Sequence, residues 1–197
     1  MPIQRAKPKF SDVKNVSIAA ANLPAGSIIK TETTPFTDFG TINMTTTANE
    51  TLIPGTEVSF TRTLSNSKIL VQYNLKCTSY ATAYLNLQRK IGSGSYATVS
   101  TGATGTQNGR TSNKQLLGAY YNNTSVNGMG YGIHSEFYQF LDSTSTGLTD
   151  SSSAITYKIT GYSSTNGYDV MLNIDGYNGT NYNSTTESSV TFMEIKV

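Results

Sequence analysis

Strict alternation of apolar and polar side chains is the feature that most constrains this chain. In residues 67–78 (SKILVQYNLKCT), every second position belongs to one apolar face, formed by Ile69, Val71, Tyr73, Leu75 and Cys77. The opposite face carries Leu70, Gln72, Asn74 and Lys76. A period of two is typical of a β-strand with one buried face, because a helix would repeat every 3.6 residues. We therefore expect a strand over residues 67–78.

Shorter versions of the same pattern predict further strands over residues 27–33, 39–46, 57–63, 83–89, 115–121, 136–141, 154–160, 169–174 and 189–197. In residues 83–89 we expect Leu85 and Leu87 to point inward and Tyr84, Asn86 and Gln88 to point outward. Turn signals separate the strands at Pro54-Gly55, Gly92-Ser-Gly94, Asn127-Gly128, Asn166-Gly167 and Asp175-Gly176. Short strands with such turns predict an all-β protein, an antiparallel sandwich or barrel of about eight to ten strands.

The composition agrees with antiparallel sheets whose outer faces are solvated. Only 13 % of the residues are charged, mean hydropathy is −0.30, and the chain has 13 Tyr but no Trp. Thr, Ser and Tyr suit the solvated face of an antiparallel strand. Aromatic and β-branched residues with little net charge argue against disorder. Neither a repeat of fixed period nor a heptad pattern is present, which argues against a solenoid or a coiled-coil shaft.

The N-terminal segment differs from the remainder in charge and in proline content. Residues 1–30 carry a net charge of +4 and residues 31–197 a net charge of −2. Pro2, Pro8 and Pro24 favour an extended backbone, although residues 17–22 (SIAAAN) could form a turn of helix. We therefore expect residues 1–25 to be an extended basic arm and residues 26–197 a β-sandwich domain. The candidate attachment residues of the arm are Arg5, Lys7, Lys9, Phe10 and Lys14.

Tyrosine lies in or beside segments rich in Gly, Asn and Ser, namely residues 91–113, 122–132 and 176–186, which we expect to be loops. Tyr combined with these small residues is typical of recognition surfaces, because Tyr offers a large contact area at a small cost in entropy. An alternative is that these tyrosines cap sheet edges and fill a trimer seam. The candidate recognition residues are Tyr120, Tyr121, Tyr131, Tyr177 and Tyr182.

Few residues suit catalysis or metal binding. Cys77 and His134 are the sole Cys and His, so the sequence offers no Cys/His zinc set. Carboxylates that could serve a glycosidase are scattered, at Glu136, Asp142, Asp150, Asp169 and Asp175. The Gly-rich segments lack the following helix that a phosphate loop requires. We expect no enzyme activity, no cofactor and no metal.

Nucleic acid and membranes are also unexpected partners. No aromatic-basic stacking motif accompanies the Lys and Arg residues of the arm, and no apolar run approaches the ~18 residues of a membrane span. The start of the chain also lacks the apolar core of a signal peptide.

Several short elements resemble β-sandwich modules of tailed bacteriophages. They are Leu23-Pro-Ala-Gly-Ser-Ile28, Ser67-Lys-Ile-Leu-Val71, Tyr84-Leu-Asn-Leu-Gln-Arg89 and Val190-Thr-Phe-Met-Glu-Ile195, in this order along residues 23–197. Such modules occur as tail-fibre tips and as free-standing proteins of the virion surface. The resemblance implies a jelly-roll-like fold, trimeric assembly and a structural or adhesive role, with no catalytic residues to transfer.

Two functions follow as expectations. The first is a capsid decoration or cement protein, made in the host cytoplasm, whose arm holds it to the major capsid protein. The second is a receptor-binding tail-fibre tip or short tail protein that adheres to host surface glycans beside other tail proteins. Either would be a homotrimer or another ring-symmetric oligomer. A sandwich with so little charge leaves uncharged sheet surface for a subunit interface to cover, and the resemblance to phage modules implies threefold assembly.

Overall fold

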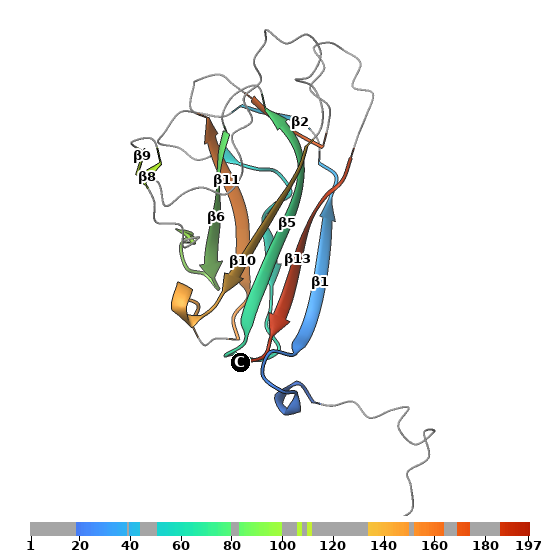
Figure 1. Cartoon of the computed structure of the whole chain (residues 1–197), viewed down its shortest axis with the longest axis vertical. Coiled ribbons are helices and arrows are strands. Elements are labelled where there is room, and N and C mark those ends of the chain that lie inside the picture. The colour runs from blue at the N-terminus through green and yellow to red at the C-terminus, as the bar shows by residue number, and fades with distance from the viewer. Residues whose placement is uncertain are drawn as a thin grey trace, which may run out of the picture.

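Two antiparallel β-sheets packed face to face form the described part of the chain (Figure 1). The computed structural model describes residues 19–38, 40–43, 51–79, 83–99, 106–107, 110–111, 134–149, 152–163, 169–173 and 186–197. The larger sheet contains β1 (Ile28–Phe36), β2 (Gly40–Asn43), β5 (Lys68–Ser79), β10 (His134–Asp142), β12 (Asp169–Leu172) and β13 (Ser188–Ile195). The smaller sheet contains β3 (Thr51–Leu52), β4 (Val58–Phe60), β6 (Ala83–Ile91), β7 (Ala97–Thr98) and β11 (Ile155–Ser163).

This architecture confirms the expected jelly-roll-like antiparallel sandwich. Nine of the ten expected strands are present within a few residues of their predicted bounds. The tenth, over residues 115–121, lies outside the described residues. The two sheets hold six and five strands, slightly more than expected, because β3 and β7 are two residues long and too short to show a period. The expected turn of helix is confirmed as the 3₁₀ helix η2 (Ala20–Asn22).

Strand β5, the longest at twelve residues, organises the larger sheet. It pairs with β10 along one side, from Cys77↔His134 to Ile69↔Asp142. It also pairs with β13 over its first half and with β12 near its end, and β1 continues the sheet beyond β13. The alternation that predicted β5 is confirmed, because Ile69, Val71, Tyr73 and Leu75 are 0–1 % exposed.

Aromatic side chains from both sheets meet in the core. The ring of Phe192 on β13 lies 5.3 Å from that of Phe60 on β4 and 5.5 Å from that of Tyr157 on β11, measured between centroids. All three residues are at most 1 % exposed. The hydroxyl of Tyr73 crosses the sandwich and donates a hydrogen bond to the carbonyl of Thr56 at 2.9 Å. Buried aromatic area of this kind stabilises one sheet against the other.

The surroundings of β6 differ from expectation in two ways. Asn86 points outward as expected, but it is only 1 % exposed, as Thr160 opposite it is at 3 %, so this part of the outer face is not solvated. Residues 91–113, expected as a loop, contain β7 and the separate two-stranded sheet of β8 (Thr106–Gln107) and β9 (Arg110–Thr111). Val99 even enters the core, and its amide donates to the carbonyl of Leu87 at 2.9 Å.

The sandwich has two distinct ends, which we call lower and upper after their places in Figure 1. At the lower end β1 and β5 begin while β10 and β13 finish. At the upper end β1 and β5 finish while β10 and β13 begin. This polarity determines where each candidate site joins the fold.

Candidate functional site

The candidate attachment and recognition residues lie outside the described part of the chain. This applies to the arm residues Arg5, Lys7, Lys9, Phe10 and Lys14, and to the recognition residues Tyr120, Tyr121, Tyr131, Tyr177 and Tyr182. The structure describes instead the residues at which their segments join the sandwich. Those junctions have a defined geometry.

The arm joins the sandwich at the lower end, and Lys196 holds the junction. The ammonium group of Lys196 donates to the carbonyls of Ala21 and Leu23, at the C-terminal end of η2. The backbone of Lys196 pairs with the same segment, since Gly26 N–H donates to its carbonyl and its own N–H donates to Ser27, both at 2.9 Å. A cation is favourable at the C-terminal carbonyls of a helix. The last residues of the arm are therefore fastened to the C-terminal end of β13.

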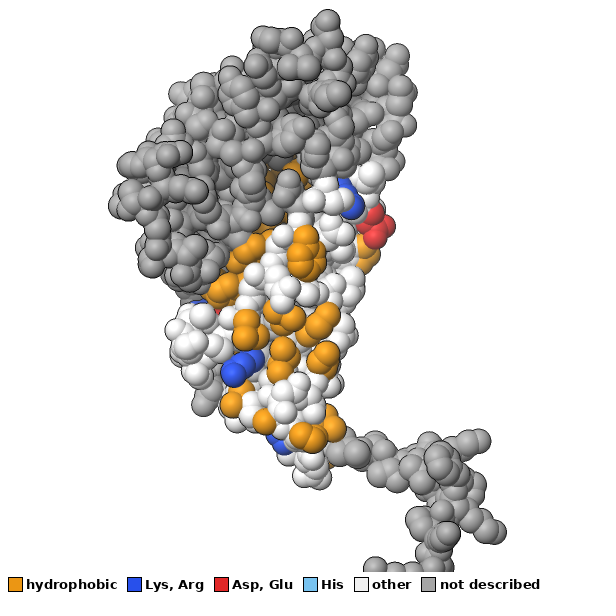
Figure 2. All heavy atoms as spheres, viewed as in Figure 1, with side chains coloured by type: hydrophobic (Ala, Val, Ile, Leu, Met, Phe, Trp, Pro, Cys, Tyr) orange, Lys and Arg blue, Asp and Glu red, His pale blue; other side chains and the backbone are white. Residues whose placement is uncertain are grey.

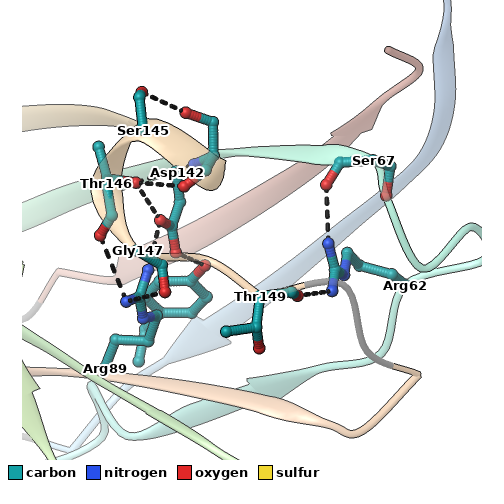
Figure 3. Close-up of polar contacts among 10 residues, drawn as sticks. Arg62, Ser67, Arg89, Asp142, Ser145, Thr146, Gly147 and Thr149 are labelled. Carbon is teal, nitrogen blue, oxygen red and sulfur yellow. Dashed lines mark hydrogen bonds and ion pairs between the residues drawn. The ribbon is translucent and has the colours of Figure 1, made fainter.

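A dense polar cluster stabilises this lower end (Figure 3). Asp142 on β10 is 0 % exposed, and the guanidinium of Arg89 on β6 contacts its carboxylate at 2.5 Å. The hydroxyls of Tyr157 on β11 and Thr146 donate to the same carboxylate at 2.6 and 2.5 Å. Arg89 also donates to the carbonyl of Gly147 at 3.0 Å. One carboxylate thus connects the two sheets and the 3₁₀ helix η3 (Thr144–Thr146).

Glu194 on β13 forms a second buried anchor at the lower end. Its carboxylate accepts hydrogen bonds from the amides of Thr63 and Leu64 and from the hydroxyl of Ser67, at 2.7–2.8 Å. Burial alone would raise the pKa of Glu194, but these hydrogen bonds stabilise the charged form more strongly and leave the pKa below its usual value. The turn before β5 is therefore held by an ionised side chain.

Arg62 fastens a further loop to this end (Figure 3). It donates to the carbonyls of Ser67 and Thr149, at 2.9 and 2.6 Å. Sequence reasoning missed Arg62, Arg89 and Glu194, because nothing local distinguishes a buried ionic residue from a solvated one. It named Asp142 as a possible glycosidase carboxylate, whereas the structure shows that carboxylate enclosed by Arg89, Tyr157 and Thr146.

At the upper end, the strands stop at the segments that carry the candidate tyrosines. Residues 112–133, with Tyr120, Tyr121 and Tyr131, precede β10, whose first residue His134 pairs with Cys77. Residues 174–185, with Tyr177 and Tyr182, lie between β12 and β13. Both segments thus connect to strands at the end of the sandwich remote from the arm junction (Figure 1).

Asn173 forms a hydrogen-bonded junction at the base of residues 174–185. It has φ of +57° and is 0 % exposed, and its side-chain amide donates to the carbonyls of Phe36 and Asp38 at 3.1 and 2.8 Å. Its side-chain oxygen accepts from the hydroxyl of Ser188 at 2.6 Å. Asn tolerates the left-handed conformation better than most residues. The Asn173 junction links the ends of β12 and β1 to the start of β13.

A backbone hydrogen bond closes this base. The amide of Thr186 donates to the carbonyl of Asn173 at 3.0 Å, and the amide of Asn173 donates to Lys76 on β5 at 2.7 Å. The two ends of the twelve-residue segment are therefore held together on the sheet. A rigid base of this kind is what a loop needs to present side chains from a fixed position.

A charged cluster on the smaller sheet was also missed by the sequence. The hydroxyl of Tyr96 donates to Glu57 at 2.6 Å, and the ammonium groups of Lys90 and Lys158 lie 4.7 and 3.8 Å from the centre of the Tyr96 ring. The hydrogen bond from Tyr96, aided by both lysines, lowers the pKa of Glu57. Burial and this hydrogen bond raise the pKa of Tyr96. The cluster holds one negative and two positive charges, and Lys90 lies 3.6 Å from the carboxylate of Glu57.

Within the described ranges, no group of three or more His, Cys, Asp and Glu side chains is arranged to hold a metal ion. No helix among those residues is both long and apolar enough to cross a bilayer.

Comparisons with known proteins return distant similarity. No protein-family model matches the chain, and no curated protein matches it. Among solved structures, the chain is similar to one of the infectious bursal disease virus Gx strain, with a TM-score of 0.39 and 11 % identity over 85 % of this chain and 37 % of that one. It is also similar to the VP2 subviral particle of infectious bursal disease virus, with a TM-score of 0.33 and 11 % identity over 87 % of this chain and 39 % of that one. This chain thus spans well under half the length of either.

Proposed function

We propose that this chain is a structural protein of the virion surface of a tailed phage, with a capsid decoration or cement role. Residues 1–25 attach it to the major capsid protein, and residues 26–197 form the exposed knob. The observation that carries the proposal is the polarity of the sandwich. The arm joins at one end through Lys196, and the Tyr-bearing segments connect to strands at the opposite end. One end can therefore face the particle while the other faces outward.

The physical chemistry of the arm supports attachment. Residues 1–30 carry a net charge of +4, which attracts an acidic neighbour and makes docking sensitive to salt. Proline restricts the free arm, so the arm loses less entropy on docking than a Gly-rich tail would. The networks of Asp142 and Glu194 give it a rigid platform at its junction.

The proposed role is non-enzymatic and needs no cofactor. The carboxylates of Asp142 and Glu194 are of a type that can act in catalysis. Both, however, accept hydrogen bonds from neighbouring residues of the fold. The proposed assembly is a homotrimer made in the host cytoplasm and joined to other virion proteins.

Receptor binding by a tail-fibre tip is the second candidate, and the Asn173 junction favours it. Binding loops gain affinity when their bases are already ordered, because less entropy is lost on contact. The segment with Tyr177 and Tyr182 has such a base. In this role the same loops would contact a host surface glycan and the arm would join a tail protein.

Deletion of the arm tests the first candidate. A variant lacking residues 1–18 retains Lys196 and its contacts, so we expect it to form a folded oligomer. In a reconstitution assay, this oligomer should no longer bind to particles that lack the protein. A second variant, in which Gln replaces Arg5, Lys7, Lys9 and Lys14, tests the charge separately. Its occupancy on the particle should fall furthest below that of wild type at low salt, where the charges of the wild-type arm are least screened. Wild-type occupancy of the deletion variant would contradict attachment by the arm.

The position and number of copies separate the two candidates. Cryo-electron microscopy of the particle should place hundreds of copies on the shell for a decoration protein. A few copies confined to the tail would favour receptor binding, and glycan-array binding by the isolated knob would then test the tyrosines.

A further inference from the structure

The outer face of the larger sheet is unusually poor in charge. Side chains pointing away from the core on β10, β5, β13 and β1 form rows across the four strands, as the pairing registers show. Figure 2 shows hydrophobic side chains spread among uncharged ones over the middle of this face, with charged side chains towards its lower and upper ends. Charged residues normally lie on exposed surfaces, and a large exposed apolar patch marks an interaction site, so this face suggests a partner.

The central three rows contain no charged side chain. One row consists of Leu141, Leu70, Met193 and Thr31. The next row consists of Gln139, Gln72, Thr191 and Thr33. The third row consists of Phe137, Asn74, Ser189 and Pro35. Phe137 and Leu141 are 60 % and 46 % exposed, although each is large and apolar. The flanking positions Lys68 and Lys76 bring the first charges, at the two ends of β5.

We infer that this face, which we call the β10 face, packs against a second copy of this chain. Charge decides the occupant. A charged partner would lose hydration on the central rows without meeting an opposite charge. Copies that bring the same face to a shared symmetry axis place no like charges in contact there, and their Gln and Thr side chains can both donate and accept hydrogen bonds.

The size of the face agrees with a subunit interface. At the usual strand spacing and rise, the three central rows cover roughly 400 Å² in projection, and the rows on either side, which contain Lys68 and Lys76, bring this to roughly 600 Å². Side chains standing out from the sheet add to that area. Stable interfaces bury about 800 Å² on each partner, so the face is of the right order.

The two edges of the sheet point to the β10 side as the centre of contact. The β1 edge has an irregular register between Ile28 and Lys30, a proline at Pro35 and the ion pair Lys30–Glu32, all of which discourage contact with another sheet. Among the described strands β10 pairs with β5 alone, in unbroken register over nine residues. Its exposed Phe137 and Leu141 have no such protection.

The inference rests on the proposed homo-oligomer and is independent of the virion role, because the test uses purified protein. We expect light scattering coupled to gel filtration, at about 50 μM protein, to give wild-type protein a mass of at least twice the 21.2 kDa of one chain. Leu141→Glu should shift the mass to that of one chain, or raise the dissociation constant at least tenfold. Gln139→Arg removes no apolar side chain and should have the same effect.

The matched control is Leu52→Glu on β3. Leu52 is 40 % exposed, similar to Leu141, but it belongs to the smaller sheet. We expect this variant to keep the wild-type mass. Circular dichroism and thermal unfolding verify the fold of each variant, and Gln139→Arg decides the question if Leu141→Glu does not fold.

Three results would overturn the inference. The first is a wild-type monomer at about 50 μM. The second is an oligomer that persists both in Gln139→Arg and in Leu141→Glu, if the latter folds. The third is that Leu52→Glu dissociates the oligomer as much as Leu141→Glu does. Loss of the arm, in contrast, should leave the number of chains in the oligomer unchanged. Failure of the β10 face and failure of virion attachment are therefore distinguishable.

Discussion

The guanidinium of Arg89 lies 2.5 Å from the carboxylate of Asp142, and this contact joins β6 of the smaller sheet to β10 of the larger one. The Asp142 side chain is 0 % exposed and that of Arg89 11 %. The hydroxyls of Tyr157 and Thr146 complete the shell around the carboxylate. Burial and the neighbouring Asp142 raise the pKa of Tyr157, so its hydroxyl remains a donor throughout the physiological range.

Replacement of Asp142 by Asn should strongly destabilise the fold. The change leaves the guanidinium of Arg89 buried without its countercharge, for which we expect a loss of about 3–5 kcal/mol. Chemical denaturation of purified protein measures this loss. The control is Glu32→Gln, which removes the exposed ion pair with Lys30 and should cost about 0–1 kcal/mol. Equal effects of the two changes would show that Asp142 is not an anchor between the sheets.

Glu194 should make stability depend on acid pH. Its pKa in the folded protein lies below the 4.5 of an unperturbed carboxyl, so the unfolded chain takes up the proton first as the pH falls. The stabilisation by Glu194 is thus complete above about pH 5 and is lost as the pH falls through the folded pKa. Glu194→Gln should be less stable than wild type at pH 7, and the difference should shrink below about pH 4.5. Unfolding curves across pH 3–7 test this, and a constant difference would contradict it.

Substitutions of Asn173 should separate its conformation from its hydrogen bonds. Asn173→Gly keeps the left-handed backbone but removes the bonds to Phe36, Asp38 and Ser188. Asn173→Ala removes the bonds and also strains the backbone, so it should cost about 1 kcal/mol more than the Gly variant. Denaturation curves of both variants provide the comparison. The prediction fails if the Ala variant is as stable as the Gly variant.

Lys196 should control the order of the arm junction. Lys196→Met keeps the backbone pairing with Gly26 and Ser27 but removes the bonds from the ammonium group to Ala21 and Leu23. We expect faster amide exchange at Asn22 and Leu23, with a change in global stability below about 1 kcal/mol. Hydrogen exchange measured by NMR reports both quantities. Lys158→Met on the smaller sheet is the control, and equal exchange in the two variants would exclude a role for Lys196.

Local patterns predicted most of the strands because their information is local. The alternation in residues 67–78 identified β5 and its buried face, and Pro54-Gly55 marked a turn in which Gly55 takes φ of +75°. The same logic failed for β7, since two residues show no period. It also failed for the exposure of Asn86, whose burial depends on what lies over the sheet.

Contacts between residues distant in sequence were decided by tertiary structure alone. Glu194 meets Thr63 across 131 positions and Asn173 meets Phe36 across 137, and neither pair has a local signature. The sequence by itself determined the strands, their inward faces and the separate charge of the N-terminal segment, because periodicity, turn chemistry and composition are properties of neighbouring residues. Only the pairing of the strands placed the arm junction opposite the Tyr-bearing segments and aligned Leu141, Leu70 and Met193 into one uncharged face. Such alignment arises from hydrogen-bonded register between strands, which brings together residues that no sequence window contains.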